Sequence, residues 1–189
     1  MKYLGYMKPV CKTKEHFYAV GLFLALTLND AGYENDAITI YNQILSMNVS
    51  SSTIYGNLGS IYSGLGNYDE AIANLRLAIQ NDDKNPAAYQ NLAKLYFDIF
   101  KLEEAKEYAE KALSINHKFR ASANLLAIIY SLEENEEQAQ KYSHIAVSSG
   151  EDPERLRLAI EKYKLTKAKD EAPNASEADV PEEDETLPG

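Results

Sequence analysis

The chain has 189 residues, 45% of them hydrophobic and 25% charged, a composition that indicates one globular domain of ordinary size. Its 29 acidic and 19 basic residues give a net charge of −10, which excludes nucleic-acid or anionic-lipid binding that needs a basic surface. The single cysteine, Cys11, cannot form an internal disulfide, and we therefore expect a cytoplasmic protein.

The first 17 residues contain Pro9 and are too few for a pair of helices, so we expect residues 1–17 to be irregular. Their apolar side chains have two possible roles. They either fold over the domain that follows or form an apolar end through which two copies of the chain dimerise. The next apolar stretch, residues 17–28, is too short to cross a membrane and is interpreted as a buried helix.

From residue 18 the chain repeats itself every 34 residues without an insertion, which divides it into units 18–51, 52–85, 86–119 and 120–153. Five columns of similar side chains keep this phase over four periods. They are Leu24, Leu58, Leu92 and Leu126; Ala37, Ala71, Ala105 and Ala139; Ala25, Gly59, Ala93 and Ala127; Leu28, Tyr62, Tyr96 and Tyr130; and Ile44, Ala78, Ala112 and Ala146.

Within each unit the apolar residues follow helical spacing on both sides of a short turn, so each unit is predicted to be a helix, a turn and a second helix. The columns of small residues allow the two helices to approach closely. Asn85 before Pro86, and Asp152 before Pro153, are typical N-caps and predict helix starts at these two boundaries.

These features resemble the tetratricopeptide repeat, whose pattern is matched best by Y-x2-L-G-x2-Y at Tyr55–Tyr62 and G-N-Y-D-E-A at Gly66–Ala71. The resemblance covers residues 18–153. It implies an all-α fold, a right-handed α-solenoid of tandem helix-turn-helix repeats in which the first helices line a concave surface. The third unit departs from the pattern by placing Phe100 at the turn glycine, and the fourth by placing Glu134 there.

The sequence beyond the repeats changes character twice. Residues 153–169 carry one apolar stripe on an otherwise basic surface, which predicts a helix that caps the fourth unit or, alternatively, offers a basic docking face. Residues 170–189 contain eight of the acidic residues and no Lys or Arg, so the remaining 169 residues have a net charge of only −2. We expect this tail to be disordered; it either keeps the chain soluble or contacts the basic helix.

No pattern of catalytic or metal-ligating residues is recognisable. The three histidines fall in different parts of the repeat frame, outside the metal and nucleophile motifs, and Gly64–Gly66 is a turn signal rather than a phosphate loop. We therefore expect a protein that is not an enzyme and has no cofactor or metal.

The concave surface is the remaining candidate site, and the residues one turn from the packing columns are expected to line it: Asn57, Ser60, Gln90, Asn91, Lys94, Phe97, Asn124 and Ile128. Asn57 and Asn91 recur at a 34-residue step, so their amides can donate to and accept from an extended peptide backbone. The resemblance implies the same role for them. They could equally be polar residues that bond neighbouring turns, and Ile128 could belong to the core.

A well-known subclass of the family clamps an acidic carboxyl terminus, but this chain matches that set only at Asn57, so no such clamp is expected. The sequence predicts a non-enzymatic module that binds a peptide segment of a protein partner, as adaptor, co-chaperone or assembly factor. The alternative is a solenoid that forms a homodimer through its N-terminal end. Neither nucleic acid nor membrane is an expected partner.

Overall fold

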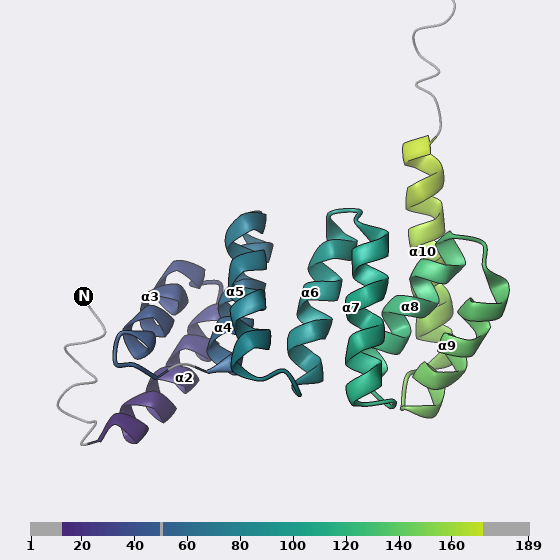
Figure 1. Cartoon of the computed structure of the whole chain (residues 1–189). Coiled ribbons are helices and arrows are strands. Elements are labelled where there is room, and N and C mark those ends of the chain that lie inside the picture. The colour runs from purple at the N-terminus through teal and green to yellow at the C-terminus, as the bar shows by residue number, and fades with distance from the viewer. Residues whose placement is uncertain (1–12, 50, 172–189) are drawn as a thin grey trace, which may run out of the picture.

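The computed structural model describes residues 13–49 and 51–171, in which every regular element is a helix (Figure 1). The elements are α2 (Lys14–Asp30), α3 (Glu34–Leu45), α4 (Ser52–Gly64), α5 (Tyr68–Asn81), α6 (Pro86–Asp98), α7 (Leu102–Ile115), α8 (Arg120–Leu132), α9 (Glu136–Ser148) and α10 (Pro153–Glu171). The pairs α2–α3, α4–α5, α6–α7 and α8–α9 follow one another along one axis, which confirms the predicted all-α solenoid. Most of the expected irregular segment and of the acidic tail lies outside the described residues.

The helix boundaries follow the capping residues. The backbone N–H of Ala87 donates to Asn85 Oδ1 over 3.0 Å, and that of Arg155 donates to Asp152 Oδ1 over 2.8 Å, as predicted. The first helix differs from expectation, because it begins at Lys14 and not at residue 18. Thr13 caps it by accepting a hydrogen bond from the His16 N–H, so residues 14–17 are helical.

Small residues bring the two helices of a unit together, as their spacing predicts. Ala71 and Ala105 are fully buried. The closest approach occurs at Gly59 of α4, where an added β-carbon would lie 2.5 Å from Cγ of Leu75 and 3.2 Å from the Ala71 carbonyl oxygen. Contacts this short do not occur between real atoms, so α4 and α5 pack at their present distance because Gly59 has no side chain.

The turn inside each unit contains one residue with a left-handed backbone, at the same place in the 34-residue frame. Its φ is 78° at Gly32, 77° at Gly66, 60° at Phe100 and 58° at Glu134. Glycine adopts this conformation freely, whereas a β-carbon makes it unfavourable by about 1–2 kcal/mol. Phe100 is therefore held in a strained backbone, and its ring is 78% exposed.

The first helices contact one another in series, α4 with α6, α6 with α8 and α8 with α10, and we call the surface they form the first-helix face. α10 packs on α8 and α9 as the first helix of a further unit would, with Leu156 buried and Ile160 partly buried. α10 thus occupies the place of the predicted cap, and it ends at Glu171 where the sequence suggested residue 169.

Candidate functional site

Asn57 connects two units through its side chain. Its Nδ2 donates to the phenol oxygen of Tyr41 on α3 over 3.0 Å, and Tyr41 is fully buried. Burial raises the pKa of Tyr41, and the hydrogen bond from Asn57 opposes that rise. Asn57 therefore has a structural partner, whatever else it contacts.

Gln90 and Asn124 also have side-chain partners. Ser122 on α8 donates its hydroxyl to Oε1 of Gln90 over 2.5 Å. Asn124 donates to Oε2 of Glu151, a nearly buried carboxylate that also pairs with Arg120 at 3.6 Å. The first hydrogen bond joins the third and fourth units, the second lies within the fourth, and both use amide groups that were expected to face a ligand.

The next three candidates lie nearer to solvent. Ser60 is exposed and donates its hydroxyl to the Gly56 carbonyl oxygen over 3.0 Å. Lys94 is exposed and pairs with Asp98, one turn further along α6, at 2.5 Å. Asn91 lies opposite Gly56 and makes no side-chain hydrogen bond within residues 13–49 and 51–171. Of the predicted amides, Asn91 is thus the one whose hydrogen-bonding groups remain available to a ligand.

Asn57→Ala and Asn91→Ala are expected to differ in their effect on stability, because Asn57 makes an internal hydrogen bond and Asn91 does not. Loss of Asn57 leaves the buried Tyr41 hydroxyl without its donor, so the free energy of unfolding falls by about 1–3 kcal/mol. Loss of Asn91 removes no internal hydrogen bond and changes that free energy by less than about 0.5 kcal/mol. Urea unfolding of both variants measures the difference; equal destabilisation would contradict the assignment.

The two apolar candidates have different surroundings. Ile128 is 8% exposed and lies in the core beside Leu125 and Leu126, against which α10 packs. Phe97 is equally buried, but it lies at the end of α6, where its ring meets that of Tyr163 edge to face at a centroid distance of 5.1 Å. Phe97 thereby links the third unit to the cap helix.

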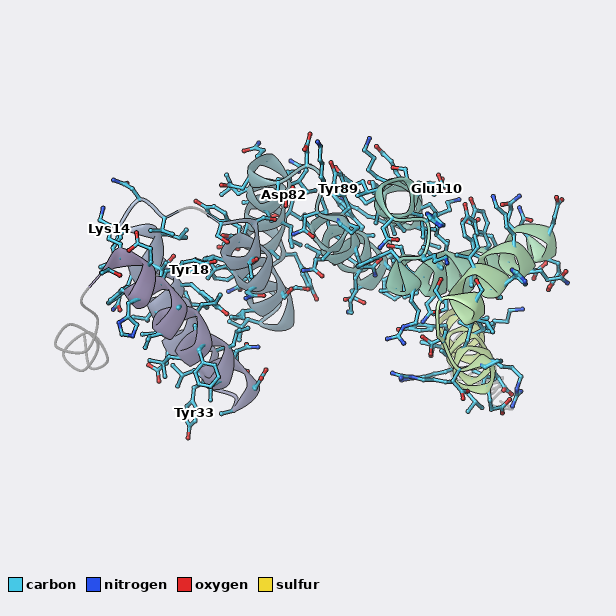
Figure 2. All side chains as sticks on the ribbon, turned by 90° about the horizontal axis from the view of Figure 1, so that it is seen from below. Lys14, Tyr18, Tyr33, Asp82, Tyr89 and Glu110 are labelled. Atoms are coloured by element: carbon cyan, nitrogen blue, oxygen red, sulfur yellow. The ribbon has the colours of Figure 1, made fainter. Side chains whose placement is uncertain are left out.

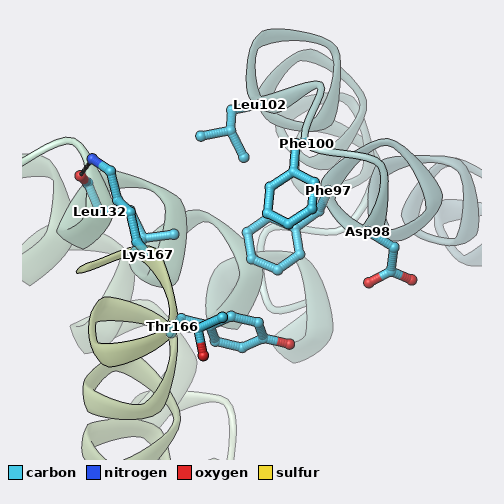
Figure 3. A pocket seen from close by; sticks show the side chains of 8 residues that line it. Phe97, Asp98, Phe100, Leu102, Leu132, Thr166 and Lys167 are labelled. Carbon is cyan, nitrogen blue, oxygen red and sulfur yellow. Dashed lines mark hydrogen bonds between the residues drawn. The ribbon is translucent and has the colours of Figure 1, made fainter. Parts of the chain in front are cut away.

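A pocket of about 540 Å³ opens where α6 and α8 end and the second half of α10 passes them. Figure 3 shows Phe97 and Phe100 on one side of it, Leu132 and Lys167 on the opposite side, and Thr166 below. Because α10 approaches α6 chiefly through the contact of Phe97 with Tyr163, the space beyond that contact stays open. The full lining comprises Phe97, Asp98, Phe100, Leu102, Leu132, Tyr163, Thr166 and Lys167.

The polar groups around the pocket already have partners. Lys167 donates to the Leu132 carbonyl oxygen over 3.0 Å, and Thr166 donates to the carbonyl oxygen one turn earlier on α10. Asp98 is paired with Lys94. The walls are mainly aromatic and aliphatic, so the pocket suits an apolar side chain of a ligand, and a charged group would gain little there.

Sequence reasoning identified Phe97 among the residues that line this pocket and missed the others. The available signal was Phe100, because a bulky residue stands where the repeat favours glycine. The contributions of Leu132 and Tyr163 could not be seen, since they depend on the angle at which α10 crosses the end of α8.

The N-terminal end of the array carries a second apolar surface. Phe23 of α2 is 73% exposed and Tyr33, just after α2, is 59% exposed. Figure 2 shows Lys14 and Tyr18 near one end of α2 and Tyr33 near the other. Side chains of this size on an end helix mark a surface that can be covered by another segment or another copy.

Among the described residues, no group of three or more His, Cys, Asp or Glu side chains is arranged to hold a metal ion. Within residues 13–49 and 51–171, none of the helices combines the length and the apolar character needed to span a membrane.

Part of the chain matches a known repeat family. Residues 50–118 match the family model of the tetratricopeptide repeat. The TPR repeat-containing protein YpiA of Bacillus subtilis (strain 168) is 27% identical over 153 residues, which are 80% of this chain. The chain spans 36% of the length of that relative.

Solved structures have a similar fold. A crystal structure of MamA is 26% identical and superposes with a TM-score of 0.65, covering 78% of this chain and 84% of that one. A thermophilic TPR protein of Thermus thermophilus, TTC0263, is 18% identical with a TM-score of 0.64, covering 83% of this chain and 92% of that one. The likeness to TTC0263 concerns the fold alone.

Proposed function

Because the chain is built of tetratricopeptide repeats, we propose that it is a non-enzymatic protein-interaction module that binds a peptide segment of a partner protein on its first-helix face. In this proposal it acts in the cytoplasm as an adaptor, co-chaperone or assembly factor, and its partners are proteins rather than nucleic acids or membranes. The fold supports interaction as the general role. The acidic composition argues against nucleic acid.

The observation that carries the proposal is the apolar pocket with the exposed ring of Phe100 at its edge. Strained backbone conformations that persist in folded proteins are concentrated at binding and catalytic sites. The left-handed backbone at Phe100 lowers the stability of the fold. Because the residue is mostly exposed, its packing within the fold offsets little of this loss. A partner side chain that packs on the ring would explain why it is there.

Asn91 gives the segment a second point of attachment. It precedes Phe97 by six residues on α6, which corresponds to roughly 9 Å along the helix. Three residues of an extended peptide cover the same distance. The two side chains also lie about 120° apart around the helix axis, so a segment with an apolar side chain in the pocket would reach the Asn91 amide by crossing the surface of α6 between them.

The test maps where a peptide binds. A peptide selected from a displayed random library on the full chain is titrated into protein with labelled leucine methyl groups. We expect signals of Leu102 and Leu132, which line the pocket, to shift, while those of Leu45, in the first unit, stay in place. Shifts confined to the first unit would contradict the proposed site.

Homodimer formation through the N-terminal end is a second candidate function, favoured by the exposure of Phe23. Sedimentation over a range of protein concentrations tests it. A dimer that dissociates on Phe23→Ser would support the candidate, because this substitution removes exposed apolar surface without touching the core. A wild-type chain that stays monomeric at the highest concentration would exclude it.

A further inference from the structure

We propose that the acidic segment of residues 172–189 folds back along α10 and inserts Leu187 into the pocket between α6, α8 and α10, so that the chain regulates access to its own binding site. This inference rests on the proposed function, in which the pocket receives an apolar side chain of a partner. The tail would compete with the partner for that site. Because both would bind the same surface, the partner is expected to offer an acidic segment with an aliphatic anchor.

The second half of α10 has the charge that such a segment would meet. Lys162, Lys164 and Lys167 lie on it, and no acidic residue occurs between them. The two earlier carboxylates of the helix, Glu154 and Glu161, both pair with Arg157. Lys162 and Lys164 have no ion-pair partner among the side chains described, those of residues 13–49 and 51–167.

Residues 172–189 have the opposite charge and a suitable anchor. They contain six Asp or Glu residues and no Lys or Arg, with four of the acids consecutive at residues 182–185. Their only large apolar side chains are Val180 and Leu187. Leu187 is the larger of the two and closely follows the acidic run, so its insertion would leave the carboxylates beside the lysines of α10.

The segment is long enough to make this contact. α10 ends at Glu171, and the pocket residues Tyr163 and Lys167 lie four to eight residues earlier, roughly 6–12 Å back along the helix. The 16 residues from 172 to 187 can span up to about 50 Å when extended. The segment is therefore longer than the distance that it must span, and Leu187 can reach the pocket without any change in α10.

Covalent attachment makes a weak contact sufficient. A short flexible connection holds its end at an effective concentration in the millimolar range. A segment whose intrinsic dissociation constant is about a tenth of that concentration would occupy the pocket about nine-tenths of the time and weaken a competing peptide about tenfold.

A single tryptophan reports whether Leu187 is buried, because the chain contains none. The full chain with Leu187→Trp is compared with the full chain with Ala175→Trp, whose indole would lie on the connecting part of the segment. We expect the emission of the former to be shifted to the blue and protected from acrylamide at low salt. The shift should disappear at high salt, which screens the lysines, and when Phe100→Gly removes the ring at the pocket edge.

Solvent-like emission from Leu187→Trp at low salt, equal to that from Ala175→Trp, would overturn the proposal. A blue shift that survives both high salt and Phe100→Gly would do so as well, because the indole would then be buried elsewhere.

Leu187→Ser separates this inference from the proposed function. It should strengthen binding of the selected library peptide to the full chain about tenfold by opening the pocket. Unchanged affinity, with the peptide still bound at the pocket, would reject regulation by the tail and leave the binding site standing. Loss of the mapped site itself would reject the proposed function, whatever the tryptophan reports.

Discussion

Gly59→Ala is expected to lower the free energy of unfolding by about 1–3 kcal/mol, although alanine is the better helix former. The new methyl group would meet Leu75 at 2.5 Å and the Ala71 carbonyl oxygen at 3.2 Å, so α5 must move away from α4 or Leu75 must leave its place in the core. Chemical unfolding followed by circular dichroism measures the loss.

Gly64→Ala is the matched control for this substitution. Gly64 is the last residue of the same helix, and a β-carbon there would meet nothing within 4 Å. It should leave stability unchanged or raise it by about 0.5–1 kcal/mol. If both variants were equally stable, the close approach of α4 and α5 would not matter energetically, and the role assigned to the small-residue column would be wrong.

Phe100→Gly is expected to weaken peptide binding about tenfold or more while making the fold more stable. Relief of the left-handed backbone contributes about 1–2 kcal/mol, and the greater freedom of glycine in the unfolded chain takes back about 0.5–1 kcal/mol. The ring is mostly exposed, so little packing is lost. If the variant binds the peptide more weakly but needs more denaturant to unfold, a damaged fold cannot be the cause of the weaker binding.

Glu134→Gly provides the comparison. Glu134 occupies the same place in the fourth unit, with φ of 58°, and does not line the pocket. It should gain similar stability and keep its affinity for the peptide. Equal loss of affinity in both variants would mean that turn flexibility, not the Phe100 ring, determines binding.

The repeat frame was predictable because its causes are local. Helical spacing, small residues at contact positions and capping side chains such as Asn85 act within one unit and recur in the next. The boundary that shifted most, at Lys14, lies before the first period, where no repeat column guides the prediction. Its cause, the cap formed by Thr13, was nevertheless readable from the sequence.

The site was less predictable because its parts depend on neighbouring units. A helical frame indicates that Asn57, Gln90 and Asn124 lie near the first-helix face, but not that Tyr41, Ser122 and Glu151 stand within hydrogen-bonding distance. The pocket was harder to predict, because it is the space left between the end of the third unit and the cap helix that follows the fourth. Only the substitution of the turn glycine by Phe100 pointed to it.

A double-mutant cycle between Phe100 and the apolar anchor of a bound peptide tests most directly whether a partner binds at the pocket. Affinities of the selected peptide and its anchor-to-alanine version are measured for the wild-type chain and for Phe100→Gly. If the anchor packs on Phe100, the two changes should be non-additive, with a coupling free energy of about 0.5–3 kcal/mol. Additive losses, with no coupling beyond error, would show that the anchor does not contact Phe100 and that the partner does not bind at this pocket.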